Sequence, residues 1–189
     1  MHNIKLWNIN NFECLLNLSR IYIDGYLYSA CFLQNYQKIF IVTCNYNVKN
    51  NPEAIKVYDF NGNKIKTINY SNEQAVFIDS YFDIKLSKNY IITNNRGHVK
   101  SYDFEKNRIY HKYYKEKNKY LFNFANIMIN DQEKIVKLIE CNDNISIWDF
   151  HKGELLNIIN VDNNLLYGIC LYNSNALIVG CGNGKIIIY

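Results

Sequence analysis

The chain has 189 residues, of which 49% are apolar and 20% are charged, and its formal net charge is +4. These values suit one globular domain with a substantial core, exclude a disordered tail, and do not by themselves imply a nucleic-acid or membrane partner. No apolar run approaches the roughly 18 residues that a membrane span needs and no signal-peptide core begins the chain, so the expected location is intracellular, cytoplasmic or nuclear.

Short segments with alternating apolar residues follow one another along the chain. In order, they include QKIFIVTC at 37–44, AIKVYDF at 54–60, KIVKLIEC at 134–141 and NALIVGC at 175–181. Turn-forming residues separate such segments at 61–63, 96–97, 151–153 and 182–184. Because the period is two and no stretch of a dozen residues offers a helical face, the sequence predicts an all-β protein with many short strands.

One of these segments recurs at intervals of roughly 40 to 50 residues, which is the period of a β-propeller blade. Its copies are NIKLWNI, AIKVYDF, HVKSYDF, NISIWDF and GKIIIY, which place the repeat aromatics at Trp7, Tyr58, Tyr102, Trp148 and Tyr189. A propeller blade is a small four-stranded antiparallel sheet that cannot bury both of its faces alone. The spacing therefore predicts a single β-propeller domain over residues 1–189.

The repeats resemble those of the WD-repeat family over essentially the whole chain. NDNISIW at 142–148 and NGKIIIY at 183–189 match the family pattern best, RGHVKSY is recognisable, and PEAIKVY matches weakly. The family usually has Asp six residues before the aromatic, whereas this chain has Pro52, Arg96, Asn142 and Asn183 there. The resemblance implies about four divergent repeats and a role as a non-catalytic scaffold that binds other proteins.

Recurrence also indicates the role of the residues that are repeated in each unit. Residues that occupy the same place in every blade are expected to have the same structural role in each. On this argument the aspartates that follow the aromatics are structural, and the aromatics pack as wedges between neighbouring sheets. These aspartates are Asp59, Asp103 and Asp149.

The number of predicted strands differs from the number that a closed four-bladed ring needs. The chain supplies the two outer strands of a blade at its start, three complete blades, and the three inner strands of a blade at its end. A closed four-bladed ring, completed by FECLLNLS at 12–19, is the alternative. We favour an open arc of a larger propeller, which would expose two apolar blade faces and promote self-association.

Candidate catalytic and metal-binding motifs are missing from the sequence. It has no nucleophile elbow and no glycine-rich phosphate loop. Neither the histidines nor the cysteines have metal-ligand spacing; the cysteines are Cys14, Cys31, Cys44, Cys141, Cys170 and Cys181. We therefore predict no enzyme activity, no cofactor and no metal, with the cysteines acting as small buried apolar residues.

A second hypothesis is that the protein recognises an anionic partner such as RNA or phosphoinositide headgroups. Its basis is the basic segment HKYYKEKNKY at 111–120, whose tyrosines could stack on bases. Loops on the same face of a propeller would bring residues 96–98 next to this segment. The candidate partner-binding residues are Arg96, His98, Lys112, Tyr113, Tyr114, Lys115, Lys117 and Lys119.

Overall fold

The computed structural model describes residues 3–18, 26–35, 38–46, 55–68, 75–95, 98–113, 124–130, 135–141, 144–161, 166–173 and 176–189. These ranges contain seventeen β-strands and no helix, which confirms the all-β prediction. Accordingly, the described residues include no helix that could cross a membrane.

The strands form five antiparallel sheets, which we number as blades 1 to 5 in chain order. Blade 1 consists of β1 (Ile4–Trp7) and β2 (Cys14–Leu18). Blade 2 consists of β3 (Tyr26–Asn35), β4 (Lys38–Tyr46), β5 (Ile55–Tyr58) and β6 (Lys64–Ile68). Blade 3 consists of β7 (Ala75–Asp83), β8 (Lys88–Asn95), β9 (His98–Asp103) and β10 (Arg108–Tyr113).

Blade 4 repeats this order, and blade 5 has three strands. Blade 4 consists of β11 (Phe124–Asn130), β12 (Ile135–Cys141), β13 (Asn144–Asp149) and β14 (Leu155–Asn160). Blade 5 consists of β15 (Leu166–Asn173), β16 (Ala176–Cys181) and β17 (Ile186–Ile188). Among the described residues, only blades 2, 3 and 4 are four-stranded, as the strand pattern predicted.

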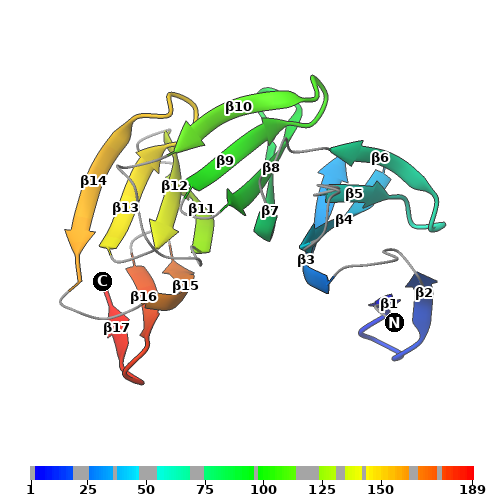
Figure 1. Ribbon diagram of the computed structural model, residues 1–189, viewed down its shortest axis with the longest axis horizontal. Coiled ribbons are helices and arrows are strands. Elements are labelled where there is room, and N and C mark those ends of the chain that lie inside the picture. Colours follow the sequence, from blue (N-terminus) through cyan, green and yellow to red (C-terminus); the bar gives the residue numbers. More distant parts are fainter. Residues whose placement is uncertain are drawn as a thin grey trace.

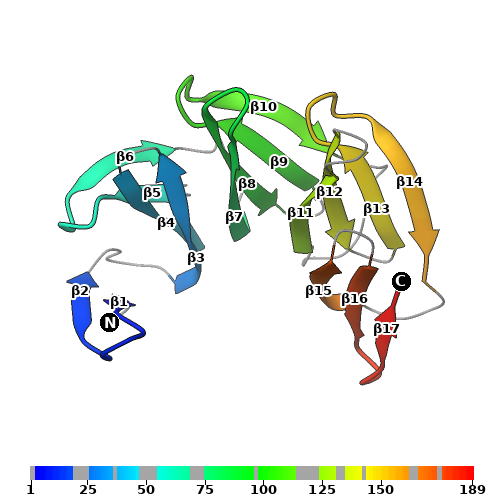
Figure 2. The same cartoon turned by 180° about the vertical axis from the view of Figure 1, so that it is seen from behind.

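The blades follow one another around an open arc (Figure 1). The first strands β3, β7, β11 and β15 are neighbours on the inner side of the arc, and the fourth strands lie on its outer side. Blade 1 and blade 5 lie at the two ends of the arc with a gap between them, and the view from behind shows the same gap (Figure 2). The fold is thus a partial, open propeller and not a closed ring.

Register confirms that the repeat aromatics occupy equivalent places. Tyr58, Tyr102 and Trp148 each lie at or one residue before the end of a third strand and pair with an apolar residue of the second strand. All three side chains are buried, as expected of wedges between sheets. Trp7 and Tyr189 hold the same position in the two end blades, where their side chains are exposed.

The core lies between blades and not within one sheet. One buried cluster joins Leu33, Ile55 and Val57 of blade 2 to Ile91 and Tyr102 of blade 3. A second joins blade 3 to blade 4, and a third joins blade 4 to blade 5. Each blade therefore depends on its neighbours for burial, which is typical of repeat architectures.

The cysteines only partly follow the expectation of burial. Cys181 is buried and Cys31 is half-buried, but Cys14 and Cys170 are exposed. The two exposed cysteines lie in β2, at one end of the arc, and in β15, on its inner side. The alternation of apolar residues along a strand does not tell which of its two faces another blade covers.

Candidate functional site

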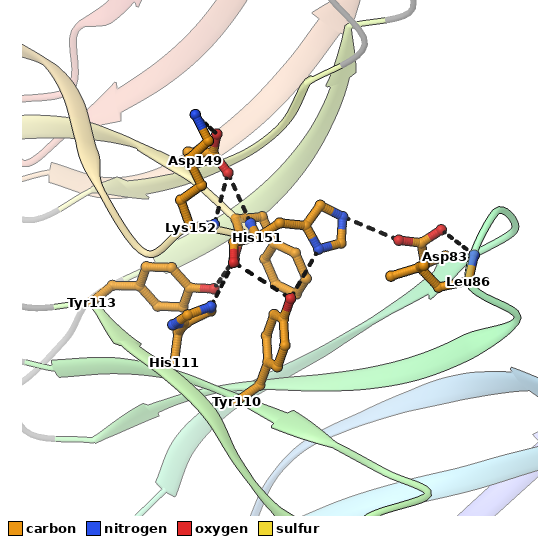
Figure 3. A network of polar contacts seen from close by, with 9 residues as sticks. Asp83, Leu86, Tyr110, His111, Tyr113, Asp149, His151 and Lys152 are labelled. Atoms are coloured by element: carbon orange, nitrogen blue, oxygen red, sulfur yellow. Dashed lines mark hydrogen bonds and ion pairs between the residues drawn. The ribbon is translucent and has the colours of Figure 1, made fainter.

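The best defined polar site lies where the turn after β13 meets blade 3 (Figure 3). We call this the turn contact; it is built around the turn residues Phe150 and His151, and Figure 3 shows His151 among its polar partners. Asp149 shapes the turn, since its Oδ1 accepts hydrogen bonds from the amides of His151 (3.0 Å) and Lys152 (2.9 Å). An Asp side chain that binds amides two and three residues ahead is a common way to fix a tight turn.

Phe150 anchors the turn contact in the core. Its ring is fully buried and meets Tyr81 and Tyr90 of blade 3 edge to face, with centroids 5.2 Å apart in both pairs. Tyr113 stacks near the same ring at 6.2 Å. Such pairs contribute roughly 0.5–1.5 kcal/mol each beyond area burial, so this one side chain joins two blades firmly.

Two side chains of β10 hold the backbone of the turn. The Tyr113 hydroxyl donates to the carbonyl of Phe150 at 2.7 Å, and the His111 Nε2–H donates to the carbonyl of His151 at 2.6 Å. The first bond is buried and also involves Ser101, whose Oγ lies 3.1 Å from the Tyr113 hydroxyl. Burial raises the pKa of Tyr113 above its ordinary value, so this hydroxyl keeps its proton and acts as a donor.

The His151 side chain links blade 4 to a second point of blade 3. Its Nε2 lies 3.1 Å from Oδ2 of Asp83, and its Nδ1 lies 3.3 Å from the Tyr110 hydroxyl. Asp83 is buried at the end of β7, where its Oδ1 also accepts the Leu86 amide at 3.0 Å. The imidazole therefore bridges the first and fourth strands of blade 3.

A carboxylate, an imidazole and a hydroxyl in this order resemble the arrangement that activates a nucleophile. The electrostatics oppose such a role here, because burial raises the pKa of the Tyr110 hydroxyl instead of lowering it. The same hydroxyl also lies 3.4 Å from the carbonyl of His151, a geometry that ties it to the turn. Within the described ranges no three His, Cys, Asp or Glu side chains gather as metal ligands. The arrangement favours holding the blades together over catalysis.

The inner strands also contain a thiol next to a carboxylate. Burial raises the pKa of Cys31 to about 12, with a further contribution from the charge of Asp79. Because the thiolate is the reactive form of cysteine, this environment makes Cys31 a poor nucleophile.

Blade 2 makes an equivalent contact with the turn of blade 3. The Lys66 Nζ donates to the carbonyl of Phe104 at 2.6 Å and lies 4.5 Å from the centre of the Phe104 ring. Lys66 pairs with Val57 as His111 pairs with Ser101, so both donors occupy the same place on the fourth strand. In both cases a side chain of a fourth strand thus donates to a turn carbonyl of the next blade, although Lys66 binds the Phe104 carbonyl and His111 binds the carbonyl one residue further along the turn.

The predicted partner-binding residues are only partly within the described residues. Arg96, Tyr114, Lys115, Lys117 and Lys119 lie outside them. His98 begins β9 opposite Asn95, and Lys112 is exposed on β10. Tyr113 pairs with Val99, so the start of β9 and the end of β10 are adjacent.

The proposed role of Tyr113 in stacking on a bound base is wrong. Its side chain is fully buried between blades 3 and 4 and hydrogen-bonded there. The sequence showed a tyrosine in a basic segment, but Tyr113 is the last residue of a strand and faces the next blade.

Sequence reasoning missed the turn contact as a site. Its residues come from β7, β10 and the turn after β13, which are far apart in the chain. One signal was available: Asp-Phe follows the repeat aromatic three times, at 59–60, 103–104 and 149–150. The assignment of these aspartates to a structural role is confirmed, because Asp59 and Asp103 also accept amides of their own turns.

Comparison with solved structures decides which fold the arc belongs to. The structure described as the WD40 β-propeller domain of Doa1 superimposes with a TM-score of 0.73 and covers 98% of this chain, at 16% sequence identity. The fold is that of a WD40 β-propeller. This chain spans 56% of the Doa1 chain, in keeping with an open arc. No protein-family model and no curated protein matches the sequence.

Proposed function

We propose that this WD40 propeller arc is a non-catalytic scaffold that binds other proteins through its turns. The supporting observation is that side chains of a fourth strand hydrogen-bond the turns of blades 3 and 4 to the blades before them. Rigid presentation of loops lowers the entropy lost on binding. WD40 propellers in general serve as interaction scaffolds, and this general role is the one that the fold supports.

The turn between β7 and β8 is the first place to look for a binding surface. Ile84 and Leu86 are exposed there, at 73% and 50% of their full accessibility. Asp83 anchors the base of this turn through Leu86 and His151. Exposed apolar side chains on a rigid turn are typical anchors for a protein partner.

The test compares two double variants of the purified chain. Ile84→Asp with Leu86→Asp should abolish the retention of bound proteins. The control Leu155→Asp with Leu156→Asp, whose side chains are 40% and 45% exposed on β14, should leave it unchanged. Identical sets of bound proteins for wild type and both variants would show that the turn is not the binding surface. Turnover of ester, phosphate or glycoside substrates that one point mutation abolishes would contradict the scaffold role itself.

The second candidate is an anionic partner bound by the basic segment at 111–120. It is favoured by the exposed Lys112, which lies beside the start of β9. Changing Lys115, Lys117 and Lys119 to Glu should weaken binding to RNA or anionic vesicles and reduce its dependence on salt. If the wild type does not bind RNA or anionic vesicles at low salt, or if the triple variant binds them as well as the wild type does, the protein scaffold would be the sole candidate.

A further inference from the structure

Three turns lie side by side at one end of blades 3 and 4. They are the β7–β8 turn at 84–87, the β9–β10 turn at 104–107 and the β13–β14 turn at 150–154. Asn89 joins the first two, because its carbonyl accepts the Phe104 amide at 3.0 Å and its side-chain amide donates to Glu105 at 3.1 Å. Asp83 joins the first to the third through its contact with His151 (Figure 3). We name the exposed residues of these three turns, and of the strand residues next to them, the turn surface.

Blade 3 contributes four cationic side chains to the turn surface. They are Lys85 and Lys88 at the first turn and Lys106 and Arg108 at the second. Lys88 is half-buried and the other three are exposed. Among the residues that the structure describes, none of the four forms an ion pair. Two adjacent turns therefore present four positive charges that no carboxylate contacts.

The carboxylates of the same two turns are held by the chain itself. Asp83 and Asp103 are buried and accept amides of their own turns. Glu105 is exposed, but its two oxygens lie 3.3 and 3.2 Å from the backbone amide of Asn89. A partner that lies on these turns would therefore contact the cationic side chains directly and the buried carboxylates not at all.

Apolar side chains alternate with these charges. Ile84 and Leu86 flank Lys85 and are 73% and 50% exposed. Phe104, the aromatic residue of the second turn, is half-buried, and the Lys66 Nζ lies 4.5 Å from the centre of its ring. The described residues of the two turns thus offer aliphatic contacts and positive charge, but no fully exposed aromatic ring.

We propose that the turn surface binds an acidic segment of a partner protein, in which carboxylates alternate with apolar side chains. Ile84 and Leu86 contact the apolar side chains of this segment. Its carboxylates pair with Lys85, Lys106 and Arg108. Charge complementarity of this kind speeds association and rejects cationic partners. The inference rests on the scaffold role proposed above and adds the chemistry of the partner.

The turn surface suits an acidic segment better than nucleic acid or an anionic membrane. Single-stranded nucleic acid stacks its bases on aromatic side chains, which the described residues of these turns do not fully expose. A flat membrane would meet the ends of both blades at once, including the exposed Glu105 and Glu154, whereas a short segment meets only the cationic part. The surface is also separate from the basic segment at 111–120, because Arg108 begins β10 and Lys112 lies near its other end.

The first test measures the fluorescence anisotropy of a labelled synthetic peptide that repeats Leu-Glu-Ser-Glu, mixed with the 189-residue chain. One comparison peptide has Gln in place of Glu, and another has Ser in place of Leu. The wild type should bind the first peptide about tenfold or more tighter than either comparison peptide, and added salt should weaken this binding. No binding at low salt, or equal affinity for the first peptide and either comparison peptide, would overturn the proposal.

The second test locates the site with matched charge reversals. Lys85→Glu with Lys106→Glu should weaken binding of the first peptide about tenfold or more, and Lys85→Gln with Lys106→Gln should weaken it by less. The control Lys5→Glu with Lys185→Glu makes the same change in net charge at exposed positions of blades 1 and 5, and should leave binding nearly unchanged. Equal affinities of the reversal and control variants would refute the turn surface as the site.

Two further outcomes separate this proposal from the scaffold role. If Ile84→Asp with Leu86→Asp abolishes the retention of bound proteins but the wild type binds no acidic peptide, the scaffold role stands and the acidic partner is wrong. If the wild type binds oligouridine RNA or phosphatidylserine vesicles but no acidic peptide, and the Lys85 and Lys106 reversal abolishes that binding, the partner is of another class and the proposal is overturned.

Discussion

At the scale of single residues, aspartate recurs because each blade needs the same turn. Asp59, Asp103 and Asp149 each follow the repeat aromatic where a third strand ends, and they accept amides of the following turn. Hydrogen bonding lowers the pKa of Asp59, the amide of Asn63 being the largest contributor. The stabilisation from a carboxylate of this kind is present above its unfolded pKa and is lost as the pH falls through its lowered value.

Removing the acceptor at Asp149 should destabilise the protein. Asp149→Ala leaves the amides of His151 and Lys152 without this acceptor and should lower the free energy of unfolding by about 1–2 kcal/mol. Asp149→Asn keeps an acceptor oxygen and should lower it by less. Urea unfolding followed by tryptophan fluorescence measures both changes, and equal losses would contradict the turn-capping role.

The pKa of Asp79 is shifted in the opposite direction to that of Asp59, so its effect on stability has the opposite dependence on pH. Burial raises the pKa of this carboxyl above its ordinary value of 3.8, although it accepts the Ser80 amide at 2.7 Å. The folded state therefore binds the proton more tightly, and stability falls as the pH rises from 3.8 through the raised pKa. Asp79→Asn should raise the melting temperature at pH 7 and leave it nearly unchanged below pH 3.8.

The repeat itself provides support for this substitution. Asn126 occupies the equivalent position of β11, opposite Ile139 as Asp79 is opposite Ile92. A melting temperature at pH 7 that Asp79→Asn leaves unchanged or lowers would show that burial of this carboxylate costs no stability.

At the scale of elements, the turn between the third and fourth strands of blade 4 packs against blade 3. Gly153 ends the turn contact with a φ of 71°, and a Cβ added there would lie 2.9 Å from Nδ1 of His111. Gly184 has a φ of 79° in the β16–β17 turn, and a Cβ there would meet no atom within 4 Å. The two positions share the backbone strain of a left-handed conformation but differ in their neighbours.

Substitution of these two glycines therefore isolates the contact between blades. Gly184→Ala should cost about 1 kcal/mol from backbone strain alone. Gly153→Ala should cost more, because His111 is held by its bond to the carbonyl of His151. Equal losses of stability in thermal unfolding would show that the His111 ring does not restrain the turn.

At the scale of the whole molecule, stability depends on position along the arc. Trp148 and Trp7 are equivalent in the repeat, but the first is buried between blades and the second is exposed at an end. Trp148→Ala should cost about 3–5 kcal/mol, as for other large buried side chains, while Trp7→Ala should cost under about 1 kcal/mol. Chemical unfolding at low protein concentration tests this, and comparable losses would contradict the register.

Much of the fold could be predicted from the sequence, because strands and blades are determined by patterns among residues that are close together in the chain. Alternation with a period of two defined the strands, and the spacing of Tyr58, Tyr102 and Trp148 defined the blades. The turn contact could not be predicted, because it joins residues of three elements that only the curvature of the arc brings together. Tyr113 illustrates the same limit, since its burial depends on blade 4, not on its neighbours in sequence.

A double-mutant cycle between Phe150 and Tyr90 tests most directly whether the repeats are blades stacked in chain order. The measured quantity is the coupling free energy of unfolding between Phe150→Leu and Tyr90→Leu, with Phe150→Leu and Ile55→Val as the distant control pair. Stacked blades predict a coupling of about 0.5–1.5 kcal/mol for the first pair. The control pair should be additive within about 0.5 kcal/mol. Additivity in the first pair would contradict the packing of blade 4 against blade 3, and with it the propeller.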